Sequence, residues 1–180
     1  MDNLWHGVAA DFQDLPDAAE ALRMSVRLML AAVLGGLLGF DRERAGKSAG
    51  LRTHMLVSLG AALFVLIPQQ AGMLDADISR VIQGTVAGVG FLGAGSIVKK
   101  SREEDVEGLT TAAGIWLTAA VGIAAGLGRE VSAILGAVLA FLILSTLARL
   151  SRWMKKVQRH NLTEVDHRNK LDSTTKAPGQ

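Results

Sequence analysis

Apolar residues make up 49% of this 180-residue chain, and 20 glycines add to them, which together exceeds the share usual in soluble domains. Such a composition excludes an intrinsically disordered chain, and the absence of cysteine excludes disulfides, thiolate metal sites and a cysteine nucleophile. A formal net charge of only +2 gives no support to a nucleic-acid partner.

Charged residues are absent from long intervals of the chain. Asp, Glu, Lys and Arg are missing from residues 28–40, 53–74, 81–98, 108–128 and 131–148. A helix that crosses a bilayer needs about 20 apolar residues. The first interval reaches this length when it is extended to Leu22, because Arg23 and Arg27 can extend to the interface. We therefore predict an all-α, polytopic membrane bundle with five transmembrane helices, at about 22–40, 53–70, 81–98, 109–127 and 131–149.

The basic residues predict the orientation of this bundle. Alternate connecting segments carry 15 and four of the 19 Lys and Arg residues, and the richer side is expected in the cytoplasm. The N-terminus is then outside and the C-terminus inside. Residues 1–20 form a polar, acidic segment in which Pro16 and Asp17 start the first helix, without the basic start of a cleavable signal peptide. Residues 21–150 form the transmembrane domain, and residues 151–180 a basic to polar cytoplasmic tail that we expect to be disordered.

Glycines recur at a spacing of four inside the predicted spans. The pairs are Gly35 with Gly39, Gly84 with Gly88, and Gly122 with Gly126. This spacing lets helices approach closely, so it predicts helix packing and is compatible with a homodimer. The third span has four glycines in eight residues, namely Gly88, Gly90, Gly93 and Gly95. Because each weakens a helix by about 1 kcal/mol relative to alanine, a discontinuous or kinked helix lining a cavity is the alternative to the favoured tight packing.

The two predicted hairpins share a weak internal similarity. A shift of 58 residues places Gly50-Leu51-x-Thr53 on Gly108-Leu109-x-Thr111. Both hairpins are expected to turn in the cytoplasm, so a repeat would relate them by an axis along the membrane normal. The fifth span lies outside this repeat.

The densest polar segment is the first cytoplasmic hairpin, residues 41–54. Asp41 and Arg52 are expected at one interface depth, where they would pair and lock the hairpin. In the alternative interpretation, Arg52 and Thr53 point into a polar cavity that binds an ion or a phosphate. Thr110 and Thr111 occupy the corresponding depth of the second hairpin and would bond backbone carbonyls or line the same cavity.

Magnesium usually keeps several of its waters, so one or two carboxylates can hold it. Candidates are Asp41, the pair Asp75 and Asp77, and the acidic run 103–105, none of them inside a span. A path for a divalent ion usually offers intramembrane carboxylates, which argues against a carrier. Neither an H-E-x-x-H motif nor a P-loop occurs. We expect no enzyme and no cofactor, with magnesium considered only as a ligand or signal and Asp41 as its candidate ligand.

Four ordered motifs carry a family resemblance: Gly39-Phe-Asp-Arg-Glu-Arg44, Ala49-Gly-Leu-Arg-Thr-His-Met-Leu-Val57, Gly88-Val-Gly-Phe-Leu-Gly-Ala-Gly95 and Gly108-Leu-Thr-Thr-Ala-Ala-Gly-Ile-Trp116. From about residue 22 to 150 the chain resembles the membrane domain of the MgtC/SapB family. The resemblance implies a multi-pass protein of the bacterial inner membrane, linked to magnesium homeostasis and adaptation to low magnesium. In pathogens it implies a role in survival inside host cells and thus in virulence.

The same resemblance implies a non-enzymatic regulator or accessory of other inner-membrane proteins, the ATP synthase among them, embedded in the lipid bilayer. A small transporter or channel for magnesium or another ion is the alternative. By motif position it assigns function to six residues, namely Asp41, Arg44, Arg52, Thr53, Thr110 and Thr111. The chain departs from the family at Asp41, where Glu is usual, and at Glu107, where a basic residue is frequent. Better-known members add a soluble C-terminal domain, whereas we expect this chain to be the membrane domain alone.

Overall fold

The computed structural model describes residues 17–99 and 106–146. The predicted acidic segment up to residue 16, the acidic run 103–105, the end of the predicted fifth span at 147–149 and the predicted tail 151–180 lie outside the described residues. The chain divides into the units Met1–Phe141 and Leu142–Gln180. All packing described below belongs to the first unit, and of the second only residues 142–146 are described, as the end of the last helix.

The first described helix, α2 (Ala18–Arg44), begins where the sequence predicts. The Asp17 carboxylate caps it by accepting a hydrogen bond from the Ala19 N–H at 3.3 Å. Glu20 in the first turn and two arginines in the last turn complement the helix dipole. The helix gives way to a tight turn at Gly46, whose φ of +65° is a left-handed conformation that glycine adopts at little cost.

The next two helices are α3 (Leu51–Gln70) and α4 (Asp75–Gly95), joined through Gly72. Helix α4 is continuous through its five glycines, so the alternative of an interrupted third span does not apply to residues 75–95. The expected end of that span at residue 98 is wrong, because the chain leaves the helix after Gly95.

Two short strands occur where the sequence predicts the helix end and its following loop. Strand β1 (Val98–Lys99) pairs antiparallel with β2 (Val106–Glu107), with Val98 opposite Glu107. The strands lead back to Gly108, where φ is +101° and an added Cβ would collide with the Ser96 carbonyl oxygen. Only glycine fits this return, which explains its place at the start of the Gly-Leu-Thr-Thr motif. Apart from these strands, the described elements are helical, as predicted.

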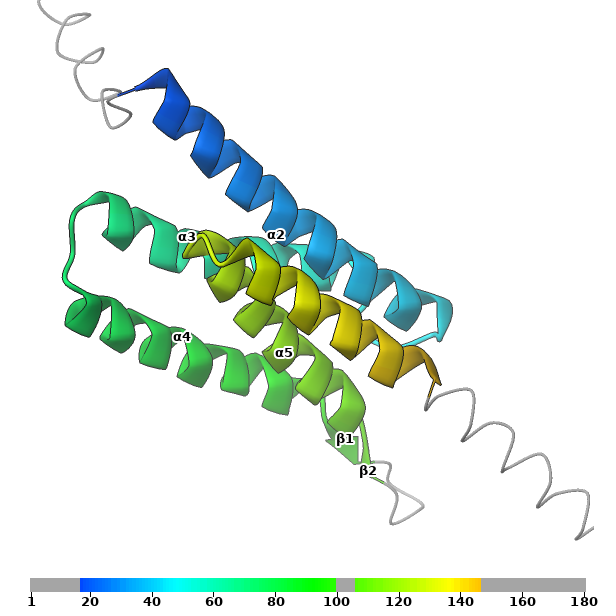
Figure 1. Ribbon diagram of the computed structural model, residues 1–180. Helices are drawn as coiled ribbons and strands as arrows, with labels where there is room; N and C mark the ends of the chain where they lie inside the picture. The colour runs from blue at the N-terminus through cyan, green and yellow to red at the C-terminus, as the bar shows by residue number, and fades with distance from the viewer. Residues whose placement is uncertain (1–16, 100–105, 147–180) are drawn as a thin grey trace, which may run out of the picture. The chain divides into compact units, whose positions relative to one another are not determined.

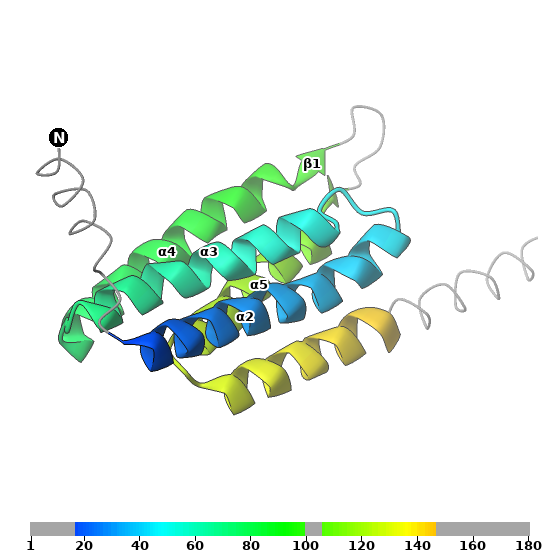
Figure 2. The ribbon, with the colours of Figure 1, turned by 90° about the horizontal axis from the view of Figure 1, so that it is seen from above.

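Helix α5 (Leu109–Gly126) contacts α2, α3 and α4 (Figures 1 and 2), and more than half of it is buried. After a turn at Gly128, the helix Glu130–Thr146 follows and buries Ala133 and Ala137 against α2 and α5. The interior is built mainly from small side chains. One buried group contains Ala31, Leu34, Ala62, Val121, Ala125, Ala133 and Ala137, and a second contains Ala49, Ala61, Val65, Val89, Ile115, Ala119 and Ile123.

Large apolar side chains lie on the outside of these helices. Leu22, Val26 and Met29 of α2, Phe64 of α3 and Phe91 of α4 are more than half exposed. An outer surface of large apolar residues around an interior of alanine and glycine is the arrangement expected in a bilayer, where lipid tails cover the apolar side chains and small residues bring helices together.

Three helices are long and apolar enough to cross a membrane, namely α2, α3 and α5. Helix α4 has the length, but Arg80, Gln83 and its glycines lower its mean hydropathy. The described part of the last helix, Glu130–Thr146, is apolar but shorter. The five described helices overlap the five predicted spans.

Candidate functional site

Helices α2 and α3 touch through two glycines of α2. An added Cβ at Gly35 would lie 2.6 Å from the His54 carbonyl oxygen and 2.7 Å from the Ser58 Cβ. At Gly39 it would lie 2.9 Å from the His54 Cβ and 2.8 Å from the Gly50 carbonyl oxygen. Real Cβ atoms do not approach this closely, so both positions require glycine while the helices keep this separation. The predicted spacing of four therefore falls on the face of α2 that meets His54 and Ser58.

Helix α5 also packs against α3 at Ser58, and it reaches Ala62 one turn further along α3. An added Cβ at Gly122 would collide with the Ser58 carbonyl oxygen, and one at Gly126 would lie 2.5 Å from the Ala62 carbonyl oxygen. About two turns before Gly122 on α5, Gly114 faces the His54 ring, with the position of its missing Cβ 3.5 Å from Nε2. Helix α3 is thus held between two glycine-lined faces.

Polar side chains fill the space that these contacts enclose. We call them the buried polar cluster: Arg42 of α2, His54 and Ser58 of α3, and Thr111 and Thr118 of α5, all at most 3% exposed. Arg42 lies one turn beyond Gly39 on α2. The cluster joins three helices near the end of the bundle where the α2–α3 turn lies.

His54 has a defined orientation in the cluster. Its Nδ1 lies 3.0 Å from the Gly50 carbonyl oxygen, and a carbonyl only accepts, so Nδ1 carries the proton in the neutral ring. Nε2 then presents a lone pair toward Gly114. The Gly114 carbonyl oxygen accepts a hydrogen bond from the Thr118 hydroxyl at 2.8 Å.

Three buried polar atoms have no hydrogen-bond partner among the described residues: Arg42 Nε, His54 Nε2 and Ser58 Oγ. The Arg42 Nη2 lies 3.7 Å from the Asp41 carboxylate, which is itself half-buried. Leaving a buried polar atom unbonded costs about 1–3 kcal/mol, and more for a charged group. The cluster is therefore a site that a small polar ligand or an ordered water would stabilise.

The residues predicted from the motifs divide between the cluster and the surface. Thr111 belongs to the buried polar cluster, and Asp41 lies at its edge beside Arg42. Arg52, Thr53 and Thr110 are exposed, and so is Arg44, whose guanidinium lies 5.5 Å from the centre of the Phe40 ring.

The predicted Asp41–Arg52 pair is wrong among the described residues, because Asp41 pairs with its neighbour Arg42 and Arg52 is exposed. Glu43 locks the hairpin instead. Its Oε2 accepts a hydrogen bond from the Leu51 N–H at 2.8 Å, which caps the start of α3.

Sequence reasoning missed four members of the cluster: Arg42, His54, Ser58 and Thr118. His54 and Ser58 repeat the spacing of four seen in the Gly35/Gly39 and Gly122/Gly126 pairs, which was the available signal. A polar pair at this spacing, between two helices with glycines at the same spacing, is the pattern of an interface with buried polar side chains.

The glycines of α4 differ from those of α2 and α5. An added Cβ at Gly93 would lie 3.5 Å from the Cβ of Ala112 in α5, an ordinary contact, whereas an added Cβ at Gly88, Gly90 or Gly95 meets no atom of the described residues within 4 Å. These three glycines lie on the exposed side of a continuous helix.

The predicted metal ligand is poorly suited to a cation. Asp41 shares its surroundings with the Arg42 guanidinium, and the described residues contain no group of three or more His, Asp or Glu that could hold a metal ion. Of the pair Asp75 and Asp77 at the start of α4, Asp77 lies 3.9 Å from the exposed Arg80.

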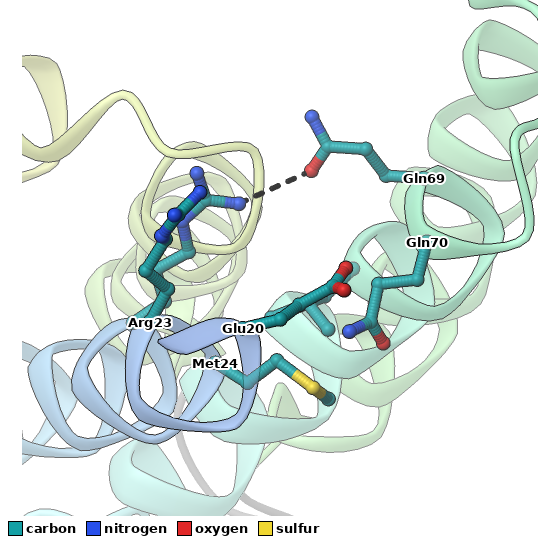
Figure 3. Close-up of a pocket in the computed structure, with 7 residues that line it drawn as sticks. Glu20, Arg23, Met24, Gln69 and Gln70 are labelled. Atoms are coloured by element: carbon teal, nitrogen blue, oxygen red, sulfur yellow. Dashed lines mark hydrogen bonds between the residues drawn. The ribbon is translucent and has the colours of Figure 1, made fainter. Parts of the chain in front are cut away.

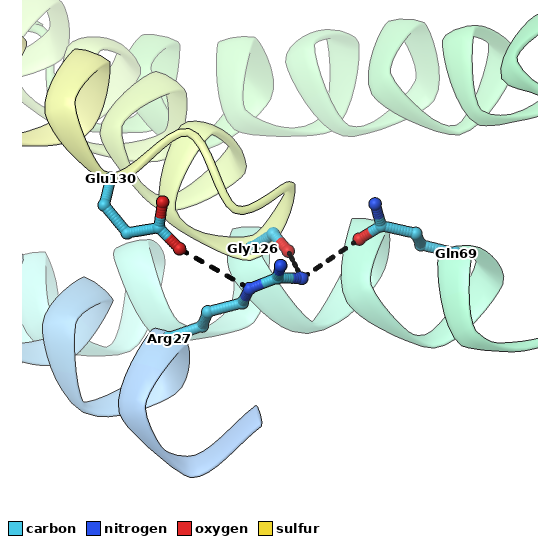
Figure 4. Close-up of polar contacts among 4 residues, drawn as sticks. All are labelled: Arg27, Gln69, Gly126 and Glu130. Carbon is cyan, nitrogen blue, oxygen red and sulfur yellow. Dashed lines mark hydrogen bonds and ion pairs between the residues drawn. The ribbon is translucent and has the colours of Figure 1, made fainter. Parts of the chain in front are cut away.

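A second polar connection lies near the opposite end of α2 (Figure 4). The Arg27 guanidinium donates to Gln69 Oε1 at 3.3 Å and to the Gly126 carbonyl oxygen at 3.4 Å, and its Nε lies 3.6 Å from Glu130 Oε1. It also fills the space beside Gly128, whose φ is +72°. One side chain of α2 thus connects α3, the end of α5 and the start of the last helix.

These features define a class of protein. Large apolar side chains face outward, small residues bring the helices together, and a cluster of polar side chains is buried between three of them, as in polytopic helical membrane proteins. The MgtC family model matches residues 28–153, and the chain belongs to the MgtC family.

Several curated proteins are similar to this chain over most of its length. It is 44% identical over 149 residues to Protein SrpB of Synechococcus elongatus, covering 75% of this chain and 81% of that protein. It is 41% identical over 150 residues to the Escherichia coli K12 protein named "Putative magnesium transporter YhiD", covering 78% and 68%. It is 47% identical over 98 residues to Protein MgtC of Brucella abortus, covering 54% of this chain but only 40% of that protein. No solved structure matches the chain.

Proposed function

We propose that this chain is a non-enzymatic, multi-pass protein of a bacterial inner membrane that supports magnesium homeostasis and adaptation to low magnesium by regulating or assisting other membrane proteins. Membership of the MgtC family supports the link to magnesium, as do the names of two relatives, "Putative magnesium transporter YhiD" and Protein MgtC. Five spans with the N-terminus outside remain the topology that the distribution of Lys and Arg favours.

The charge of the buried polar cluster is the observation that carries the regulator proposal. Arg42 is the one Asp, Glu, Lys or Arg side chain that is buried among the described residues. A dication about 5 Å from its guanidinium would be repelled by about 7 kcal/mol at an effective dielectric constant of about 20. The Asp41 carboxylate beside Arg42 reduces this repulsion, but the pair has no net negative charge with which to attract a cation. Binding of Mg²⁺ in the buried polar cluster is therefore unfavourable.

The outer face of α4 is a suitable surface for a protein partner. Gly84 and Gly88 have no atom within 4 Å in the described part of the chain, and Phe91 beside them is 82% exposed. Two glycines at this spacing let a partner helix approach closely. The partner that the family resemblance implies is another inner-membrane protein, with the ATP synthase as the first candidate. A second copy of this chain is the other occupant to test.

Ion transport is the second candidate function. It is favoured by the three buried, unpartnered atoms of Arg42, His54 and Ser58, since polar groups inside a membrane bundle mark many ion pathways. Transport would require the glycine contacts around His54 to open.

Reconstitution into liposomes with a magnesium-sensitive dye separates the two functions. The regulator proposal expects no protein-dependent flux from the wild type. Arg42→Gln and Arg52→Gln make a matched pair, because both remove one guanidinium from the same hairpin but only Arg42 is buried. Flux that the Arg42 variant abolishes and the Arg52 variant preserves would overturn the regulator proposal in favour of transport.

Cells that lack the chromosomal copy provide the complementary test. We expect Arg42→Gln to lose complementation at low magnesium while the protein stays in the membrane at its normal level, and Arg52→Gln to complement. Co-purification of the ATP synthase or another membrane complex with the wild type, weakened by Gly88→Leu on α4, is the expected sign of a partner. Unchanged co-purification with this variant would exclude α4 as the partner surface.

A further inference from the structure

A pocket of about 170 Å³ lies between the start of α2 and the end of α3, near the opposite end of α2 from the buried polar cluster (Figure 3). It is lined by Glu20, Arg23, Met24, Arg27, Leu66, Gln69 and Gln70. The proposed topology places this end of the bundle at the outer surface of the membrane. Neither the family motifs nor the proposed function uses these residues.

The pocket carries one unmatched charge of each sign. The charge of Arg27 is offset by Glu130 at 3.6 Å, and its Nη1 is hydrogen-bonded to Gln69. Arg23 and Glu20 remain, and neither lies within 4 Å of an opposite charge in the described part of the chain. Figure 3 shows their side chains diverging, with Glu20 directed toward Gln70 and Arg23 away from it.

We propose that this pocket binds the headgroup of a phospholipid that carries both a phosphate and a primary ammonium, that is, a phosphatidylethanolamine. The phosphate lies against the Arg23 guanidinium, since guanidinium and phosphate form strong charge-assisted hydrogen bonds. The ammonium donates to the Glu20 carboxylate and to the amide oxygen of Gln70. An ethylene group joins the phosphate ester to the ammonium of this headgroup, so the two charges can contact different side chains.

Apolar residues around the pocket favour a lipid over a soluble phosphoester. Met24 and Leu66 form its apolar lining. Just beyond it, Val26 of α2 and Ile67 of α3 are more than half exposed. Acyl chains attached to a headgroup in the pocket would cover these side chains, and each buried CH₂ adds about 0.8 kcal/mol.

The charges predict a selectivity among headgroups. Phosphatidylglycerol offers the phosphate but no cation for Glu20, and phosphatidylcholine offers a cation without N–H donors. A charge-assisted hydrogen bond is worth about one to two tenfold steps in affinity. We therefore expect phosphatidylethanolamine to bind about tenfold more tightly than the other two.

Native mass spectrometry of the purified full chain, titrated with the three lipids of identical acyl chains, measures this selectivity. Glu20→Gln should reduce the preference for phosphatidylethanolamine over both other lipids, because the amide keeps an acceptor but loses the charge that attracts the ammonium and strengthens its hydrogen bond. Arg23→Gln should weaken the binding of all three lipids about tenfold. Arg80→Gln is the matched control, since Arg80 is exposed at the same end of the bundle but outside the pocket.

One further variant and one competition experiment complete the test. Gln70→Leu changes a neutral, exposed residue of the pocket. It therefore still tests the pocket if Glu20→Gln or Arg23→Gln fails to fold. Soluble glycerophosphoethanolamine should fail to displace the lipid, and displacement at equal concentration would assign the site to a soluble phosphoester and overturn the lipid. Equal affinity of the wild type for all three lipids, or equal effects of Arg80→Gln and Glu20→Gln, would also overturn the proposal. Its outcome is independent of the flux and complementation tests above.

Discussion

Gly122→Ala is the substitution for which the structure makes the sharpest prediction. The added Cβ would lie 2.8 Å from both the Cα and the carbonyl carbon of Ser58 and would collide with its carbonyl oxygen. These are backbone atoms of α3, so no rotation of a side chain relieves the contact. Helices α3 and α5 would have to separate by about 1 Å to restore a normal carbon–carbon distance of about 3.5–4.0 Å.

The cost follows from this separation. A gap of about 0.5–1 Å forfeits a quarter to a half of the dispersion energy of each contact between the helices, and overpacked cores lose about 1–3 kcal/mol. The better helix propensity of alanine returns up to about 1 kcal/mol. We expect a net loss of about 2 kcal/mol, and hence a melting temperature lower by about 4–8 °C for a chain of this size.

Matched variants separate packing from helix propensity. At Gly88 an added Cβ meets no atom of the described residues within 4 Å, and at Gly114 it makes an ordinary contact of 3.5 Å with His54 Nε2. Thermal denaturation of the purified proteins in one detergent, followed by size-exclusion chromatography, should rank Gly122→Ala lowest and Gly88→Ala level with or above the wild type. Equal melting temperatures for these two variants would refute the close approach of α3 and α5.

Three other predictions test the ends of the bundle. Arg27→Gln should lower stability by about 1 kcal/mol in the same assay, because its ion pair is part-exposed and its hydrogen bonds are long, whereas Arg80→Gln should change nothing measurable. Glu43→Ala should cost about 1 kcal/mol through the lost cap of α3, and Glu43→Gln, which keeps an acceptor, less than half of that. Because the chain has no cysteine, Ser48→Cys and Ala71→Cys report topology directly: an impermeant maleimide added to intact cells should label residue 71 and leave residue 48 unmodified, and the reverse pattern would invert the proposed orientation.

Much of the fold was predictable from where charges are absent. The described helices overlap the predicted spans, and Asp17 caps the first one as expected. The two strands between α4 and α5 were not predictable, because strands of two residues carry too little periodicity to be recognised in a sequence. The two strands can pair because Gly108, in a left-handed conformation, turns the chain back close to the Ser96 backbone.

The candidate site was predictable only in part. The motifs pointed to a hairpin that carries part of the buried polar cluster, and they included Thr111, but the neighbouring Arg52, Thr53 and Thr110 are exposed. Which polar residue of a helix is buried depends on the face its neighbours cover, and a single sequence does not state which helices are neighbours. His54 is buried because α2 and α5 both pack against the part of α3 that carries it.

The sequence by itself determined that this protein is a helical membrane bundle and which family it resembles, because the length of uncharged segments and the order of motifs are properties of one chain. Only the tertiary structure decided which glycines touch another helix, which arginine is buried, and which carboxylate locks the first hairpin. Those outcomes depend on distances between helices: Gly122 and Gly88 have the same chemistry, yet one lies against the backbone of α3 and the other has open space beside it.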